Sequence, residues 1–108
     1  MCACTQVAKE LGALLVFMEH RFFGHSMPFA NKTLDGAAKP LGLGVLSVEQ
    51  GLADYADLVT SVLDNHSAWG CPTVSFGGSL GGTLAALIRV RYPHLIDMAW
   101  SSSSPLLG

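Results

Sequence analysis

One serine of this chain lies inside a glycine run with the spacing of a catalytic turn. Residues 77–82 read Gly-Gly-Ser-Leu-Gly-Gly, so Ser79 is the centre of a G-x-S-x-G pattern. A short β-type run, residues 72–76, precedes the pattern, and an apolar helical pattern, residues 83–91, follows it. In a nucleophile elbow, a serine at a sharp strand-to-helix turn holds its Oγ exposed above the sheet. The pattern in this setting predicts that Ser79 is a nucleophile for acyl transfer.

The residues around Ser79 fit the demands of such a turn. Side chains two positions either side would clash, so we expect glycine to be required at Gly77 and Gly81, within a turn that also contains Gly78 and Gly82. The helix N-terminus supplies donors and a partial positive charge where an oxyanion develops, which predicts the Leu80 backbone N–H as one oxyanion donor. A tight structural turn or a phosphate-cradling turn is the alternative. A P-loop is disfavoured, because no Lys-Ser/Thr pair follows the glycines.

The order of residues along the chain indicates which histidines could act as the catalytic base. In the fold to which the elbow belongs, the catalytic acid and histidine follow the serine. Three histidines precede Ser79 and are therefore not predicted as the base: His20, His25 and His66. His94 and Asp97 follow it, but they come just before a strand pattern, whereas catalytic loops follow the carboxyl ends of strands. We expect the acid and base of a triad to lie beyond Gly108.

Helical and strand patterns alternate along the chain. The predicted order is a helix over residues 5–11 with Gly12 as its C-cap, a wholly apolar strand over 14–18, a long loop over 19–46, a helix from Ser47 to about Leu63, a strand over 72–76, a helix over 83–91 and a strand over 95–100. Ser47 and Gln50 form a capping box at the start of the longest helix. Apolar residues recur along this helix at helical spacing and predict one apolar stripe: Val48, Leu52, Tyr55, Ala56, Val59, Val62 and Leu63. Wholly apolar runs suit strands buried on both faces of a parallel sheet. The order is that of consecutive βαβ units, so the fold class is α/β.

Composition limits the classes of function. The chain has 108 residues, of which 50% are hydrophobic and 13% charged, with a net charge of −2. This composition argues against disorder, and no basic patch is present for nucleic acid. The longest apolar run, residues 13–18, is far shorter than the roughly 20 residues of a membrane span. The N-terminus lacks the basic region of a signal peptide.

The cysteines bear on metal binding, and the asparagines bear on covalent modification. Cys2, Cys4 and Cys71 do not match zinc-ligand spacing, so we expect them to be small buried hydrophobes, and we expect no metal and no cofactor. Asn31 and Asn65 each begin an N-x-S/T sequon and are candidate N-glycosylation sites.

Residues 17–28, 46–54 and 77–82 are three ordered segments. Together they resemble one serine peptidase family, which includes lysosomal Pro-X carboxypeptidase, dipeptidyl peptidase II and thymus-specific serine protease. Residues 17–28, Phe-Met-Glu-His-Arg-Phe-Phe-Gly-His-Ser-Met-Pro, are similar to its E-H-R-aromatic-aromatic-G-x-S-x-P segment. Residues 46–54 are similar to its L-[ST]-x-E-Q-A-L-A-D helix, and residues 77–82 to its G-G-S-Y-[GA]-G elbow. Two departures are Leu80, where tyrosine is usual, and Gly51, where alanine is usual and which should weaken the helix slightly.

The resemblance implies a partial α/β-hydrolase fold, with residues 1–108 as the central part of a peptidase domain whose flanking strands, cap and remaining triad lie elsewhere. It implies a serine exopeptidase directed at prolyl bonds, a carboxypeptidase or a dipeptidyl peptidase, that forms an acyl-enzyme on Ser79. Peptides are the implied substrates, the location is lysosomal or secreted, and a homodimer of the full-length enzyme is left open. Glu19, His20 and Arg21 are candidates for lining the pocket or orienting the loop, and an ion pair between Glu19 and Arg21 is the favoured arrangement.

Two other functions also fit the sequence. An esterase or lipase-like hydrolase shares the elbow but not the E-H-R segment. A catalytically inactive fragment is the other, because a serine without its base is a weak nucleophile and the isolated chain is expected to be inactive.

Overall fold

The computed structural model describes residues 3–27 and 47–105. The elements, in chain order, are α1 (Ala3–Leu11), α4 (Val48–Asn65), β1 (Val74–Gly78), α5 (Leu80–Arg91) and β2 (Met98–Ser102). In the described ranges, none of the helices is long and apolar enough to cross a membrane.

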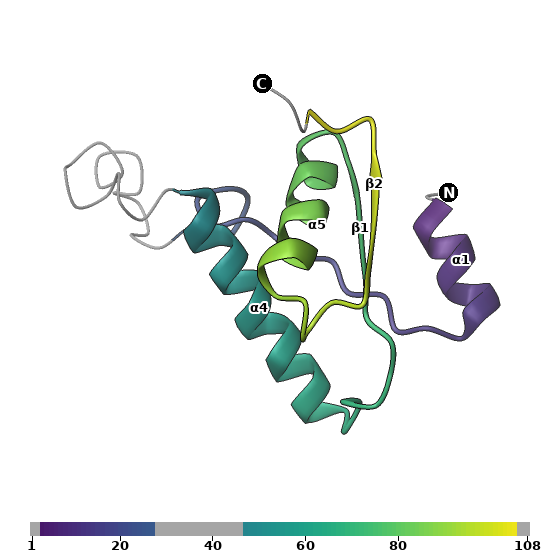
Figure 1. Cartoon of the computed structure of the whole chain (residues 1–108). Helices are drawn as coiled ribbons and strands as arrows, with labels where there is room; N and C mark the ends of the chain where they lie inside the picture. Colours follow the sequence, from purple (N-terminus) through teal and green to yellow (C-terminus); the bar gives the residue numbers. More distant parts are fainter. Residues whose placement is uncertain (1–2, 28–46, 106–108) are drawn as a thin grey trace.

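The two strands form a parallel pair that α5 connects. Their register runs from Val74 opposite Met98 to Gly78 opposite Ser102, so both strands end at the same edge of the sheet. Figure 1 shows α5 against the strands, α4 beyond α5 on the same side, and α1 on the other side. The arrangement confirms the α/β class and the parallel pairing.

The core lies between α4, α5 and the turn that leads into β2. Its buried side chains are Leu52, Tyr55, Ala56, Ile88, Leu95 and Ile96. The first three belong to the apolar stripe predicted for the long helix, which confirms that this stripe faces the core. Ser47 caps the helix as predicted, since its Oγ accepts a hydrogen bond from the Gln50 N–H at 3.2 Å.

The first helix ends where the sequence predicts. Gly12 has a φ of +61°, the left-handed conformation typical of a residue just past a helix end. The next N–H, of Ala13, donates to the carbonyl of Ala8 at 2.8 Å. The predicted C-cap of the first helix is therefore confirmed.

The strand predicted over residues 14–18 is wrong for this structure. The segment has no regular secondary structure, and the Phe17 side chain is 75% exposed. A strand needs a neighbour for its backbone hydrogen bonds, and within the described ranges β1 and β2 pair only with each other. Only Met18, at the end of the run, packs against the core.

The boundaries around the glycine run are shifted from the predicted ones. β1 ends at Gly78 and α5 begins at Leu80, so strand and helix share the glycines instead of flanking a separate turn. The last strand begins later than predicted, because the N–H groups of Leu95 and Ile96 both donate to the Tyr92 carbonyl. This turn places both side chains in the core before the strand starts.

The face of the sheet away from α5 is apolar and exposed. Val74 and Phe76 of β1 lie opposite Met98 and Trp100 of β2, and all four side chains are exposed. The Phe76 and Trp100 rings stack with centroids 5.3 Å apart. Alternation along each strand sends the other residues towards α5, where the Ser75 Oγ donates to the Ala85 carbonyl at 2.9 Å.

Candidate active site

Ser79 is the single residue between β1 and α5, and its backbone is unusual. Its φ is 55° and its ψ is −128°, a conformation that residues other than glycine rarely adopt. The residue is exposed, and its side chain makes no capping hydrogen bond to the helix. A serine that begins a helix normally turns its Oγ back onto the first N–H groups. Here the Oγ remains available for other chemistry.

Backbone hydrogen bonds hold Ser79 in this conformation. Its N–H donates to the carbonyl of Ser102, the last residue of β2, at 3.0 Å. Its carbonyl accepts from the N–H groups of Gly82 and Thr83, at 3.0 and 3.1 Å. The turn is therefore anchored to the sheet on one side and to the first turn of α5 on the other.

Close packing at the turn requires glycine at Gly77, one of the two predicted positions, and leaves little room for a side chain at Gly82. A Cβ on Gly77 would collide with the Gly81 carbonyl and lie 2.7 Å from the Gly82 nitrogen. A Cβ on Gly82 would lie 3.0 Å from the Gly77 carbonyl oxygen and 3.1 Å from the Ser101 Oγ. The requirement expected at Gly81 is wrong, because a Cβ there meets nothing within 4 Å. Gly78 is also uncrowded, since the nearest atom to its Cβ would be 3.9 Å away.

The first N–H of α5 is positioned to act as a donor. In the described part of the chain, the Leu80 N–H has no hydrogen-bond acceptor, as expected for the first N–H groups of a helix. The Leu80 side chain is 63% exposed beside Ser79. This N–H and the positive end of the helix dipole can stabilise negative charge that develops next to the serine.

Serines at the end of β2 and just after it support the turn from the other strand, a role that the sequence pattern did not predict. The Ser101 Oγ donates to the Gly82 carbonyl at 2.8 Å and lies 2.5 Å from the Ser104 Oγ. The Thr83 Oγ1 donates to the Pro105 carbonyl at 3.3 Å. The run of four serines at residues 101–104 was visible in the sequence, but only the register shows that it faces the glycine turn.

Glu19 closes the loop that follows the apolar run. One of its carboxylate oxygens, Oε2, accepts from the backbone N–H groups of His25 and Ser26, at 3.0 and 2.7 Å, and from the Ser26 Oγ at 2.6 Å. The hydrogen bond from the Ser26 hydroxyl, followed by that from the His25 N–H, lowers the pKa of this carboxyl. Gly24 has a φ of +66°, and a Cβ there would collide with the Glu19 carboxylate. The positive φ and this contact together favour glycine at this point of the loop.

Arg21 pairs with Asp54, and the expected Glu19–Arg21 ion pair is wrong. The guanidinium Nε and Nη2 of Arg21 lie 2.6 and 2.5 Å from the two carboxylate oxygens of Asp54, on α4. These hydrogen bonds lower the pKa of Asp54 and raise that of Arg21. The Glu19 carboxylate instead accepts hydrogen bonds from His25 and Ser26 of its own loop. Sequence reasoning passed over Asp54, although it belongs to the helix motif that the resemblance singled out.

His20, which lies between Glu19 and Arg21 in the sequence, packs against α4. Its ring makes edge contacts with Phe23 and Tyr55, at centroid distances of 5.5 and 6.1 Å, and its Nδ1 lies 2.7 Å from the Arg21 carbonyl oxygen. A Cβ on Gly51 would lie 2.6 Å from the His20 Nε2. The glycine that departs from the family pattern thus makes room for this ring. Residues 19–21 contact their own loop and α4, which favours the loop-orienting interpretation of all three.

His94 and Asp97 lie at the opposite end of the sheet from Ser79. The Asp97 carboxylate accepts from the Thr73 N–H at 2.8 Å, just before β1 starts. Because β1 has five residues at about 3.3 Å each, about 16 Å of strand separates this end from Ser79.

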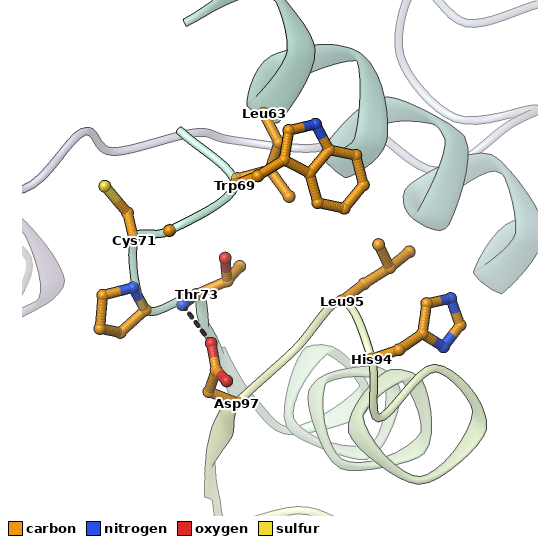
Figure 2. A pocket seen from close by; sticks show the side chains of 9 residues that line it. Leu63, Trp69, Cys71, Thr73, His94, Leu95 and Asp97 are labelled. Carbon is orange, nitrogen blue, oxygen red and sulfur yellow. Dashed lines mark hydrogen bonds between the residues drawn. The ribbon is translucent and has the colours of Figure 1, made fainter. Parts of the chain in front are cut away.

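A pocket of about 190 Å³ lies at that same end, with Trp69, Cys71, His94 and Asp97 among its lining residues. Figure 2 shows the Thr73–Asp97 hydrogen bond in the pocket and the Cys71 and His94 side chains directed apart. The polar groups do not converge on one point, and the pocket is remote from Ser79.

The remaining candidates are dispersed. Cys71 is exposed, so its expected burial is wrong, whereas Cys4 is half-buried. Asn65 is the last residue of α4 and is exposed; Cys2 and Asn31 lie outside the described residues. Residues 3–27 and 47–105 contain no group of three or more His, Cys, Asp or Glu side chains that could hold a metal ion.

Comparison with known proteins defines the class. The family described as Serine carboxypeptidase S28 matches residues 2–108, and the chain belongs to this family. The glycine turn, the loop over residues 19–26 and α4 all lie within the matched residues.

Individual relatives narrow the comparison. The chain is similar to mouse lysosomal Pro-X carboxypeptidase, with 42% identity over 101 residues that are 93% of this chain and 20% of the relative. It is similar to prolyl carboxy peptidase like protein 5 of Caenorhabditis elegans, with 42% identity over 103 residues, 93% of this chain and 20% of the relative. Mouse thymus-specific serine protease is 42% identical over 103 residues, 93% of this chain and 19% of that protein. The chain spans about a fifth of the length of these relatives.

Proposed function

We propose that Ser79 is the nucleophile of a serine exopeptidase that cleaves peptides next to proline. The observation that carries this proposal is the backbone of Ser79, held at φ 55° and ψ −128° between a strand and a helix with its side chain exposed and uncommitted. Such conformations persist only where the surrounding structure enforces them, and they concentrate at functional sites. Membership of the serine carboxypeptidase family supports the reaction class.

The chemistry would follow the acyl-enzyme route. A histidine base of the complete enzyme accepts the Oγ proton as the Oγ attacks the peptide carbonyl, and the oxyanion accepts a hydrogen bond from the Leu80 N–H. The leaving amine takes the proton, and water then hydrolyses the ester. The described histidines make their contacts at α4, in the 19–26 loop or at the starts of the strands, so we propose that the triad Asp and His come from other segments of the enzyme.

The direction towards prolyl bonds rests on the names of the relatives, lysosomal Pro-X carboxypeptidase among them. A lysosomal or secreted location is proposed on the same basis. Leu80 adds an apolar side chain beside the nucleophile, where the family usually has tyrosine. We propose that it forms an apolar rim of the substrate pocket and leaves the N–H donor unchanged, because that donor belongs to the backbone.

The isolated chain is proposed to be inactive. Within the described residues, the edge of the sheet that carries Ser79 has no histidine–carboxylate pair, and a serine without its base loses several orders of magnitude in rate. Incubation of the 108-residue chain with a prolyl peptide should therefore give no turnover above buffer.

A chimera tests the proposal. This chain replaces the matching segment of mouse lysosomal Pro-X carboxypeptidase, and hydrolysis is measured on a carboxy-terminal prolyl peptide, an amino-terminal Xaa-Pro dipeptide amide and a short acyl ester. The chimera should hydrolyse one of the prolyl peptides, and Ser79→Ala should lower kcat by at least roughly a thousandfold without changing the melting temperature.

Two results would contradict the proposal. Hydrolysis of the ester alone would indicate an esterase. A prolyl activity that survives Ser79→Ala would place the nucleophile elsewhere. Leu80→Tyr is the matched variant for the pocket rim: it should change KM more than kcat.

A further inference from the structure

The end of α4 presents a second chemically distinct site, the sequence Asn65-His66-Ser67. Asn65 is the last helical residue, His66 is the C-cap with φ −103° and ψ 3°, and Ser67 has a φ of 51°. The chain then folds back, since the Ala68 N–H donates to the Leu63 carbonyl at 2.8 Å. The sequon therefore sits in a turn at a helix end and not inside regular structure.

The groups that a glycosylated asparagine needs are accessible there. Asn65, His66 and Ser67 are all exposed. In the described part of the chain, neither the Asn65 side-chain amide nor the Ser67 hydroxyl takes part in a hydrogen bond. The backbone N–H groups of residues 66–68 close the helix end without them. A substituent on the Asn65 Nδ2 would break none of the contacts that end the helix.

The position of Asn65 also keeps it away from the proposed nucleophile. The 18 residues of α4 span about 27 Å, and Figure 1 shows the helix ending near the start of β1, whereas the Ser79 turn lies at the opposite end of the strands. A bulky group at Asn65 would project from the end of the molecule remote from Ser79. It would not cover the turn.

We propose that Asn65 carries an N-linked glycan. The proposal rests on the lysosomal or secreted location given under the proposed function, because transfer takes place in the secretory lumen. The donor is a lipid-linked oligosaccharide diphosphate. The Asn65 Nδ2 forms a bond to the anomeric carbon, the bond from that carbon to the diphosphate oxygen breaks, and the amide releases one proton.

The test expresses the full 108-residue chain behind a cleavable secretory leader in animal cells, with a known sequon appended at the C-terminus as an internal control. Every variant carries Asn31→Gln, so that Asn65 is the remaining natural sequon. Release with peptide N-glycosidase in heavy-oxygen water converts a glycosylated asparagine into a labelled aspartate, which peptide mass spectrometry assigns to its position.

The label is expected at position 65 in the parent chain and in Ser67→Thr, which preserves the sequon. It is expected to disappear in Asn65→Gln and in Ser67→Ala, while the appended control stays labelled. A labelled control together with an unlabelled Asn65 in the parent chain would overturn the proposal. This outcome is independent of the peptidase proposal, because the leader is supplied and no activity is read; in the chimera, Asn65→Gln should leave prolyl hydrolysis unchanged.

Discussion

At the scale of single residues, Ser79 combines a strained backbone with an uncommitted side chain. A non-glycine residue in such a region costs about 1–3 kcal/mol, and a helix loses about 1 kcal/mol without a side-chain N-cap. The structure offsets this locally through the hydrogen bonds that Ser79 makes to Ser102, Gly82 and Thr83. The conformation that exposes the Oγ is thus maintained by the neighbours of the serine, and these neighbours are small.

Gly77→Ala tests how tightly the turn is packed. The new Cβ would meet the backbone of Gly81 and Gly82, which cannot move without disturbing the start of α5. We expect the free energy of unfolding to fall by about 1–3 kcal/mol, measured by urea denaturation of the chain. In the chimera, kcat should fall as well, because Ser79 shifts with the turn.

Gly81→Ala is the matched control, since a Cβ there meets nothing within 4 Å. It should leave stability unchanged or raise it by up to about 1 kcal/mol, because alanine is the better helix former. Equal destabilisation by the two substitutions would refute the packing described for the turn.

At the scale of elements, the E-H-R segment fastens a loop to α4. Glu19 closes the loop on itself, Arg21 pairs with Asp54, and His20 fills the space that Gly51 leaves. The three residues act as one anchor with three different contacts. This explains why a charged segment directly follows an apolar run: the chain leaves the core at Met18 and is held immediately afterwards.

The Arg21–Asp54 pair should make stability depend on pH. Arg21 lowers the pKa of Asp54 in the folded protein, so its contribution is complete above the ordinary aspartate pKa of about 3.9 and is lost as the pH falls through the lowered folded value. The pair is partly exposed, with side-chain exposures of 17% and 42%, so a double-mutant cycle with Arg21→Met and Asp54→Asn should give about 0.2–1 kcal/mol at neutral pH.

Urea denaturation measures the cycle at neutral pH and again below the folded pKa, where the coupling should vanish. Glu19 also has a lowered pKa, and the cycle removes its contribution because Glu19 is present in all four proteins. A coupling of the same size at both pH values would contradict the ion pair.

Much of the structure of the individual elements could be predicted from the sequence, because it depends on residues close together along the chain. The N-cap at Ser47, the stripe that includes Leu52 and Tyr55, and the C-cap at Gly12 depend on neighbours along the chain, and all three are confirmed. The outcome for residues 14–18, the partner of Arg21 and the tight packing at Gly82 depend on residues distant in sequence. Propensity and periodicity carry no information about such partners.

At the scale of the whole molecule, the parallel strand pair leaves one face of the sheet apolar and exposed. One face of β1 and β2 packs on α5, and the other presents Phe76 and Trp100 as an exposed apolar surface. Parallel strands in α/β proteins read as apolar on both faces. The chain belongs to the serine carboxypeptidase S28 family and spans about a fifth of its relatives, so its activity is best tested inside one of them.

The most direct test of the account is to map where a fluorophosphonate binds in the chimera with mouse lysosomal Pro-X carboxypeptidase. The reagent phosphonylates an activated serine, and tandem mass spectrometry of the digested protein assigns the adduct to one residue. We predict a single adduct on Ser79, lost in Ser79→Ala and retained in Ser101→Ala, which removes a supporting serine and keeps Ser79. An adduct on any other serine, with Ser79 unmodified in an active chimera, would contradict it.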